Sequence, residues 1–195
     1  MYGNGYSFID NYLYLYNIDK FFVIPVDPET IQDSMGASFT SSQPLGRSAP
    51  VWSYTGSGPR QVQVSFTLHR DMMNDVNAAS SNLRLENFEG SRTDDYVDAL
   101  IKGLQASVLP EYDAANKAVN PPMVAMRLGD EVFIKGIINS SIGVNYKLPR
   151  LRSGKYAVVD LSITITEVDA YSASTVYDVG SFRGLSTTLQ RRAQK

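Results

Sequence analysis

The sequence contains no cysteine and only one histidine, His69, and both features limit the chemistry that the chain can perform. Without cysteine there is no thiol nucleophile, redox pair or thiolate metal site, and no disulfide can support the fold. With one histidine, a metal site built on two imidazoles of the same chain is excluded, and a triad-type nucleophile would have to recruit His69. We therefore expect no enzyme activity, cofactor or metal.

Charged residues are also scarce: they make up 19% of the chain, and the formal net charge is -2. About a quarter charged is usual for a soluble domain, so the low value indicates that neighbouring proteins cover part of the surface. A net negative chain also lacks the broad basic surface of a protein that grips nucleic acid. No segment approaches the ~18 apolar residues of a spanning helix, and residues 1–6 lack a secretory pattern, so we expect cytoplasmic production and no membrane contact.

Two segments alternate apolar and polar residues, which is typical of strands with one buried face. In residues 61–69, His69 falls on the polar side and the buried face consists of Val62, Val64, Phe66 and Leu68. In residues 157–166, the buried face consists of Val159, Leu161, Ile163 and Ile165. Both segments therefore predict long amphipathic strands.

The segment between these strands predicts an antiparallel meander. Residues 124–128 and 131–138 flank the dipeptide Gly129-Asp130, which is typical of a tight hairpin. Gly136 indicates a bulge or the close approach of another backbone. Further strands are expected at residues 12–16, 20–25 and 141–146.

One amphipathic helix is expected at about residues 92–108. Hydroxyl and acidic side chains at residues 91–95 suit a helix start, and Pro110 follows its end. The apolar positions repeat at helical spacing and are Val97, Leu100, Ile101, Leu104 and Val108. The fold class is therefore mainly β, of the α+β type, with this helix against an antiparallel barrel or sandwich.

The 195 residues suit a single domain. We divide it into an N-terminal arm (1–20), a β core with the helix (21–171) and an exposed C-terminal tail (172–195). Two long segments, 33–59 and 71–90, show little periodicity and are expected to be irregular. In an assembly such segments commonly reach a neighbour, so we assign inter-subunit contacts to segment 33–59, the arm and the tail.

Short motifs with a catalytic meaning lack their required context. His69-Arg70-Asp71 copies three letters of the kinase catalytic loop, but Val76 stands where the magnesium-binding Asn is needed. Acidic pairs such as Asp94 and Asp95 would need to converge on a pocket to act as acid and base, and helix starts, turns or strand ends explain nearly all of them. We therefore assign no catalytic residue.

Aromatic and basic side chains are the candidates for contacts between subunits. The N-terminal aromatics lack the interleaved Lys and Arg of a nucleic-acid site and are better explained as core or interface anchors. The basic run at residues 147–155 suits either a solvated loop or a contact with an acidic neighbouring subunit. The residues assigned to contacts are Tyr12, Tyr14, Trp52, Tyr54, Arg60, Arg150, Arg152 and Lys155.

Taken in order, several segments resemble the tube-type subunits of contractile phage tails and related injection systems, especially the baseplate proteins that join the central hub to the tail tube. The resemblance spans about residues 21–170. It is carried by the Pro-Glu-x-Ile-like element in residues 23–31 and by Gly58-Pro59-Arg60 before an alternating strand. Downstream it continues through the helix and through segments 121–124, 128–129, 133–138 and 165–169.

The resemblance implies a tail-tube-type β-barrel or sandwich with a flanking helix, arranged as six copies in a ring whose inner strands line a channel. Implied partners are further copies in a homohexamer, the tail tube protein and baseplate hub or adaptor proteins. DNA or a tape-measure protein would pass through without specific binding, since a wall of like negative charges would not trap DNA. The implied location is the virion tail or baseplate, assembled in the bacterial cytoplasm.

Many injection-system relatives add a LysM module after this domain, and the sequence as given leaves no room for one. We therefore expect a ring that connects the hub to the tube and initiates tube assembly, with an ordinary tube subunit as the runner-up. A third hypothesis is a glycan-active β-sandwich, which requires two convergent carboxylates in a pocket. A glycan-binding module using Trp52 and Tyr54 is the fourth, and it would remain monomeric.

Overall fold

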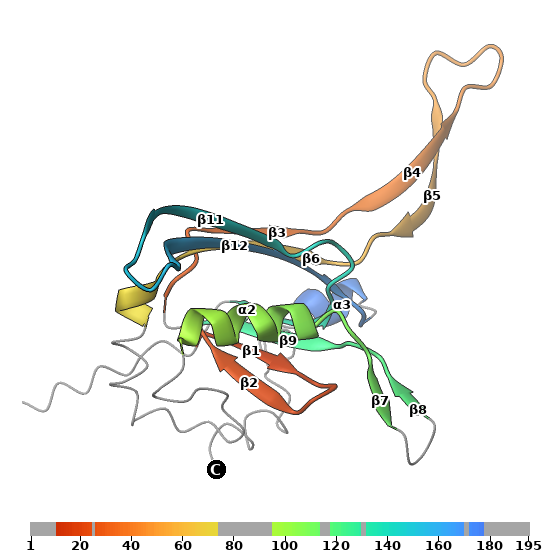
Figure 1. The fold of residues 1–195 in the computed structure, drawn as a ribbon. Coiled ribbons are helices and arrows are strands. Elements are labelled where there is room, and N and C mark those ends of the chain that lie inside the picture. Colours follow the sequence, from red (N-terminus) through yellow and green to blue (C-terminus); the bar gives the residue numbers. More distant parts are fainter. Residues whose placement is uncertain are drawn as a thin grey trace, which may run out of the picture.

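The computed structural model describes residues 11–24, 26–73, 95–113, 118–129, 132–169 and 172–177. Eight strands form one antiparallel sheet with the order β2-β1-β9-β10-β12-β6-β3, and β11 pairs with β12 on the side that also holds β10. Helix α2 (Tyr96–Ala106) lies between the upper and lower strands (Figure 1). The expected mainly β fold with one flanking helix is thus confirmed, although the sheet is not closed into a barrel within one chain.

The strands of this sheet are β1 (Tyr12–Leu15), β2 (Lys20–Val23), β3 (Thr30–Ser34), β6 (Gln61–His69), β9 (Val124–Leu128), β10 (Val132–Ile137), β11 (Gly143–Arg150) and β12 (Tyr156–Glu167). Two separate hairpins project from it: β4 (Ala37–Ser42) with β5 (Val51–Ser57), and β7 (Glu111–Asp113) with β8 (Ala118–Asn120). A short helix, α3 (Ala173–Tyr177), follows β12, and the rest of the expected tail lies outside the described residues.

The core lies between the sheet and α2. All eight apolar residues predicted to face inward from β6 and β12 are buried, and they pack with apolar residues of β1, β2, β9 and α2. Tyr96 of α2 donates a hydrogen bond to the carbonyl of Val23, which holds the helix on β2. The long β6–β12 pair is in continuous register from Val158 opposite His69 to Thr166 opposite Gln61.

The predicted hairpin between β9 and β10 is present, and Gly129 has a positive φ of 56°. Leu128 pairs with Val132, so the paired ends of the two strands are one residue farther apart in the sequence than a two-residue turn at Gly129-Asp130 requires. A Cβ atom on Gly136 would lie 2.0 Å from the carbonyl oxygen of Thr166. The expected close backbone approach at Gly136 is therefore confirmed.

Three expected boundaries differ from the structure. Strand β1 pairs with both β2 and β9, so residues 12–20 of the expected arm belong to the sheet and to the β1–β2 turn, and residues 1–10 lie outside the described part. Helix α2 begins after its N-cap, Asp95, and ends at Ala106. Val108 therefore follows the helix and is partly exposed, and residues 92–94 lie outside the described range.

The prediction that residues 33–59 are irregular is wrong. They complete β3 and form β4 and β5, which together continue the β3–β6 pair as a long hairpin. Nearly every residue of β4 and β5 is exposed. Because neither face of this hairpin is buried in the chain itself, its sequence lacks the alternation of apolar and polar residues that indicates a half-buried strand. Most of segment 71–90 lies outside the described residues.

Candidate assembly interface

The face of the sheet that points away from the core is polar across β11, β12, β6 and β3. Cross-strand hydrogen bonds join its side chains: Thr30 to Ser65 at 2.7 Å, and the Thr67 hydroxyl, as donor, to Asp160 at 2.8 Å. The strand register places on this face Thr30, Gln32, Gln63, Ser65, Thr67, His69, Asn145, Lys147, Val158, Asp160, Ser162 and Thr164. Most of these residues are hydroxyl- or amide-bearing and uncharged.

The charges on the polar face are partly neutralised within the chain. Lys147 and Asp160 form an ion pair at 2.5 Å, and Glu29 lies close to it. The hydrogen bond from Lys147 holds the pKa of the Asp160 carboxyl below its usual value, so this carboxyl is ionised and paired at neutral pH. Hydroxyl and amide side chains therefore outnumber charged ones on the polar face.

Two strands of the polar face have a free edge in the described part of the chain. β3 pairs only with β6, and β11 pairs only with β12. On the core side of these strands, Ile31 pairs with Val64 and Tyr146 with Val159. Both valines are fully buried, whereas Ile31 is 45% and Tyr146 is 48% exposed. Each edge is therefore polar on one side and has an uncovered apolar residue on the other.

The hairpin formed by residues 37–57, called here the aromatic ribbon, extends beyond the sheet (Figure 1). A hydrogen bond from Gly58 N to Gly36 O, 2.8 Å long, joins the two chains at its base. The register places Phe39, Trp52 and Tyr54 on one side, where the rings of Phe39 and Tyr54 meet edge to face at 5.5 Å. The opposite side carries mainly small hydroxyl residues, namely Thr40, Ser42 and Ser53.

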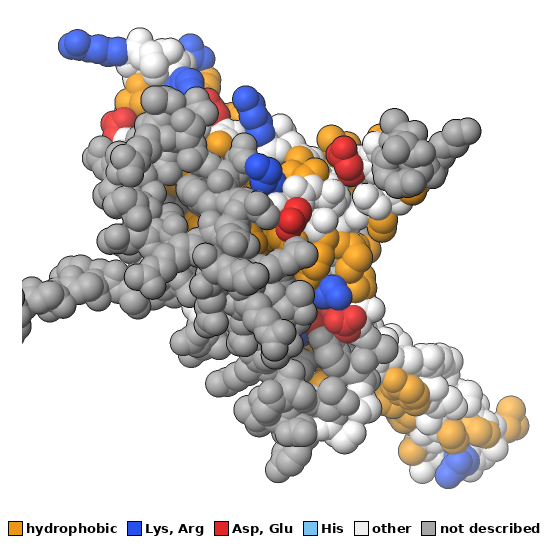
Figure 2. Space-filling model, turned by 90° about the horizontal axis from the view of Figure 1, so that it is seen from below, with side chains coloured by type: hydrophobic (Ala, Val, Ile, Leu, Met, Phe, Trp, Pro, Cys, Tyr) orange, Lys and Arg blue, Asp and Glu red, His pale blue; other side chains and the backbone are white. Residues whose placement is uncertain are grey.

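The aromatic side of the ribbon is uncovered. Trp52 is 63% and Tyr54 60% exposed. In Figure 2 the ribbon is the arm at lower right, along which hydrophobic side chains stand out. A two-stranded hairpin with no core beneath it is at best marginally stable in water, so contact with another protein would stabilise it. Trp52 and Tyr54 are thus available for the contacts between subunits that we expect of them.

Arg150 and Arg152 are also available, at the opposite end of the sheet. Both are exposed, at the end of β11 and in the turn that leads to β12. The guanidinium of Arg150 stacks over the ring of Tyr156 at 4.8 Å and donates a hydrogen bond to its hydroxyl. In the basic run at residues 147–155, Lys147 and Lys155 form ion pairs with acids of the same chain. These two lysines are therefore neither fully solvated nor free to bind an acidic neighbour.

Four residues assigned to subunit contacts have places inside the chain instead. Tyr12 and Tyr14 are 1% exposed and pack with Phe21 in a second apolar cluster on the sheet. Arg60 is 6% exposed, with its guanidinium held by Asp33 at 2.6 Å and by the carbonyl of Phe133 at 3.1 Å. These three side chains are therefore core and fastening residues of the single chain.

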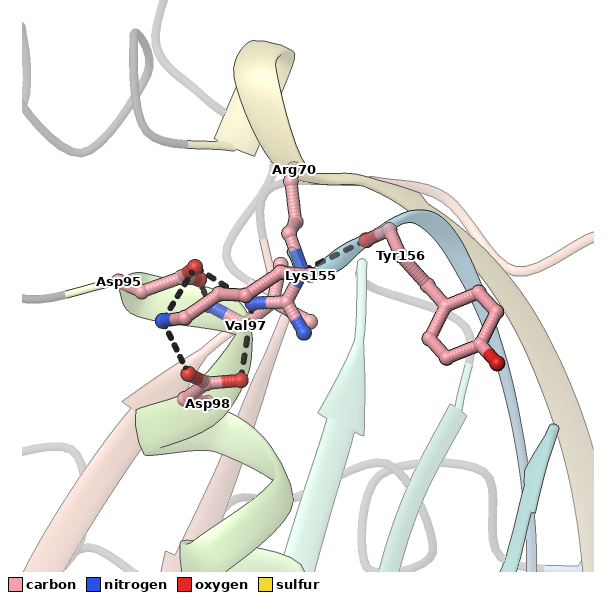
Figure 3. Close-up of polar contacts among 6 residues, drawn as sticks. All are labelled: Arg70, Asp95, Val97, Asp98, Lys155 and Tyr156. Atoms are coloured by element: carbon pink, nitrogen blue, oxygen red, sulfur yellow. Dashed lines mark hydrogen bonds and ion pairs between the residues drawn. The ribbon is translucent and has the colours of Figure 1, made fainter. Parts of the chain in front are cut away.

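Lys155, the fourth, belongs to an ion cluster at the start of α2 (Figure 3). Its ammonium lies 2.5 Å from Asp98 and 3.0 Å from Asp95. The guanidinium of Arg70, which is 3% exposed, lies 2.5 Å from Asp95 and 2.8 Å from Asp98. Arg70 also donates to the carbonyl of Tyr156, so the cluster joins β6, β12 and the helix.

The electrostatics of this cluster argue against acid–base chemistry. Burial alone would raise the pKa of the Asp98 carboxyl, but the hydrogen bonds from Lys155 and Arg70 hold that pKa below its usual value. Asp95 is occupied as the N-cap, because its carboxylate accepts a hydrogen bond from Val97 N. Asp95 and Asp98 line an open depression of about 510 Å³ beside Lys155, yet both are paired with cations. Arg70, read in the sequence as part of a kinase-like motif, fastens the helix.

No cluster of metal-ligating side chains occurs in the part of the chain that the structure describes. Among the described helices, none has the length and apolarity needed to cross a membrane. The chain matches no family model, and no curated protein is significantly similar to it.

Proposed function

We propose that this chain is a structural, non-enzymatic protein of a contractile tail or injection system, which forms a ring between the baseplate hub and the tail tube. In this proposal the ring is a homohexamer, the polar face lines its channel, and one side of the ring is the template for tube assembly. Its place is the virion tail or baseplate. The observation that carries the proposal is the polar sheet face bounded by two free, amphipathic edges.

The strand directions support ring closure through these edges. β3 is antiparallel to β6, β6 to β12, and β12 to β11, so β3 and β11 run in opposite directions. When rotation about a ring axis brings β3 of one copy beside β11 of the next, the junction is therefore also antiparallel. Such a junction satisfies the open backbone groups of the β3 and β11 edges in every copy once the ring is closed.

The side chains of the two edges support the same junction. The polar residues of both strands stay on the channel side, while Ile31 of one copy and Tyr146 of the next meet on the opposite side. Burying two apolar residues that are now about half exposed contributes to the association of copies. A channel wall of hydroxyls and amides offers few cations to the phosphates of DNA, so DNA or an extended protein passes without being held.

The test uses two adjacent residues of β3 whose side chains point to opposite faces of the sheet. Ile31→Lys places a charge in the junction and is expected to raise the concentration needed for ring formation at least ~10-fold, about 1.4 kcal/mol. The matched control Gln32→Lys changes the polar face and leaves ring formation within ~3-fold of wild type. Native mass spectrometry and negative-stain images measure ring formation, and thermal unfolding verifies that both variants fold.

Ring formation by the Ile31→Lys variant at wild-type concentrations would contradict the proposal. An ordinary tube subunit would use the same junction, and measuring the mass of complexes with a tail tube protein separates it from an initiator. The exposure of Trp52 and Tyr54 also suits a glycan-binding module. That alternative predicts a monomer at every concentration, with glycan binding lost in the Trp52→Ala variant.

A further inference from the structure

The strand pairing of the sheet does not run on without a break into the aromatic ribbon. The end of β3 pairs with the start of β6, and the start of β4 pairs with the end of β5. Between these pairs lie residues 35–36 on one strand and 58–60 on the other, called here the joint. Two residues therefore face three, and Pro59 has no N–H to donate, so a regular ladder cannot cross the joint. Figure 1 shows the ribbon turning away from the sheet at this place.

Two glycines face each other in the joint, and the conformation of the chain there requires neither. Gly36 and Gly58 do not have a positive φ, and they share a hydrogen bond of 2.8 Å from Gly58 N to Gly36 O. A Cβ atom on Gly36 would have no neighbour within 4 Å, and one on Gly58 would make an ordinary contact at 3.6 Å. Glycine lowers the stability of an extended segment because it loses the most conformational freedom on folding. What these two glycines supply is therefore freedom for the joint to change direction.

Arg60 restrains the joint in the direction that the structure shows. Its Nε and Nη2 atoms donate to the carboxylate of Asp33 in β3, at 3.0 and 2.6 Å. Its Nη1 atom donates to the carbonyl of Phe133 in β10 at 3.1 Å. Binding of a carboxylate by two guanidinium nitrogens fixes the direction of the contact as well as its length. The guanidinium is buried, whereas the side chain of Asp33 is 41% exposed, so the contact lies at the surface of the joint.

We propose that the aromatic ribbon is a hinged arm. The contact between Arg60 and Asp33 latches the arm in one direction, and Gly36 and Gly58 let it turn when a partner binds its aromatic side. A partner that contacts the exposed aromatic side better in another direction shifts the arm towards that direction, by the difference between its two affinities. This device lies within a single chain, so it does not depend on the proposed ring.

Spin labels test the hinge in the full-length chain, which has no cysteine of its own. One nitroxide is attached at Ser42→Cys in the ribbon and one at Thr164→Cys on β12, and the labelled chain is diluted with unlabelled chain so that only intramolecular distances are measured. Asp33→Asn is expected to widen the distance distribution in double electron–electron resonance at least ~2-fold, since it removes the charge that the guanidinium binds. The control Arg47→Ala, between β4 and β5, also removes a charge and leaves the distribution unchanged.

The glycines are tested in the chain whose latch is open. Adding Gly36→Ala and Gly58→Ala to Asp33→Asn is expected to return the width to within ~1.5-fold of wild type, because alanine restricts the backbone without a clash. Thermal unfolding verifies that the variants fold. Arg60→Lys keeps the cation but cannot bind with two nitrogens, so it opens the latch in a second way if Asp33→Asn does not fold.

The two parts of the device fail separately. A distribution that stays narrow when the latch is opened would overturn the role of Arg60. A wide distribution that the two alanines do not narrow would overturn the hinge. Ring formation is measured independently, so either result leaves the ring proposal standing.

Discussion

Gly136 lies where β10 passes the end of β12, and no side chain fits there. A Cβ atom would lie 2.0 Å from the oxygen and 2.7 Å from the carbon of the Thr166 carbonyl, both backbone atoms that cannot turn aside. Gly136→Ala is therefore expected to lower the free energy of unfolding by about 2 kcal/mol or more, measured by denaturant titration.

Gly56→Ala is the control for this prediction. Gly56 lies in β5, and a Cβ atom there has no neighbour within 4 Å. The substitution is expected to change the free energy of unfolding by less than about 1 kcal/mol. Any change is expected to be stabilising, because alanine reduces the conformational freedom of the unfolded chain. An equal loss in both variants would mean that the crowding at Gly136 is not the cause.

The arginines show how one residue type takes different roles in this chain. Arg60 and Arg70 are buried and bind carboxylates, while Arg150 and Arg152 are exposed at the turn before β12. The neighbours of each arginine in the sequence do not distinguish them. The difference arises because residues far along the chain, Asp33 for Arg60 and Asp98 for Arg70, arrive beside the buried pair.

Helix α2 is fastened to the sheet by the cluster of Arg70, Lys155, Asp95 and Asp98, and this attachment is expected to depend on pH. The folded chain holds the pKa of Asp98 below its usual value of 3.8. The unfolded chain therefore takes up the proton first as the pH falls. The contribution of Asp98 is complete above its usual pKa and is lost as the pH drops through the lower folded value.

The Asp98→Asn variant measures this contribution. At pH 7 the variant is expected to be less stable than the wild type by about 1 kcal/mol, a modest value because the partly exposed pair is screened by solvent. The difference should shrink as the pH falls below 4, as measured by denaturant unfolding at pH 7, 5 and 3. Glu111→Gln, on exposed β7, is the control and should show no such pH-dependent difference. A gap that is constant with pH would contradict the ionic role of Asp98.

The aromatic ribbon is an element that gains little from its own chain. Its strands bury no core residue, and its internal contacts are a two-stranded ladder, the Phe39–Tyr54 pair and a few exposed hydrogen bonds such as that from the Thr55 hydroxyl to the carbonyl of Ser38. The β3–β6 pair anchors its base, because the same two chains continue into the sheet. An anchored hairpin with an apolar side is suited to binding an extended or grooved surface on a neighbour.

At the scale of the whole molecule, the sheet separates two environments. Its core side packs on α2, and over β11, β12, β6 and β3 its other side is an uncovered face of mainly hydroxyl and amide side chains. In the proposed ring this polar face surrounds the channel. Because the face carries few charges, it attracts the phosphates of DNA only weakly. The exterior of the ring is then formed by the helix side of each copy.

The channel can be tested by adding one cation for each copy. Thr164 pairs with Gln63 on the polar face, and Thr164→Lys is expected to give DNA binding that weakens steeply with salt, while wild-type rings bind no DNA at 150 mM salt. Filter binding at several salt concentrations measures this. Ala118→Lys, on exposed β8, adds the same charge away from the face and should not produce it. Equal binding by both variants would contradict the assignment of the channel.

Much of the fold could be predicted from the sequence because burial leaves a local pattern. Strict alternation in residues 61–69 and 157–166 determined two central strands, and helical spacing determined α2, since each element has one face in the core. The lack of cysteine and the single histidine limited the possible chemistry without reference to any fold. Gly136 indicated a close contact, although its partner, Thr166, was not predictable.

The tertiary structure alone decided which residues are available for contacts. Four residues have side chains of the types common at interfaces, yet they make contacts within the chain. Neighbouring strands bury Tyr12 and Tyr14, while distant acids bind Arg60 and Lys155. The aromatic ribbon has no buried face, so no periodicity could reveal its strands, and only pairing across residues 37–57 shows them. Local patterns record whether a side chain faces the core, whereas free edges and opposite ends depend on how distant strands are ordered in the sheet.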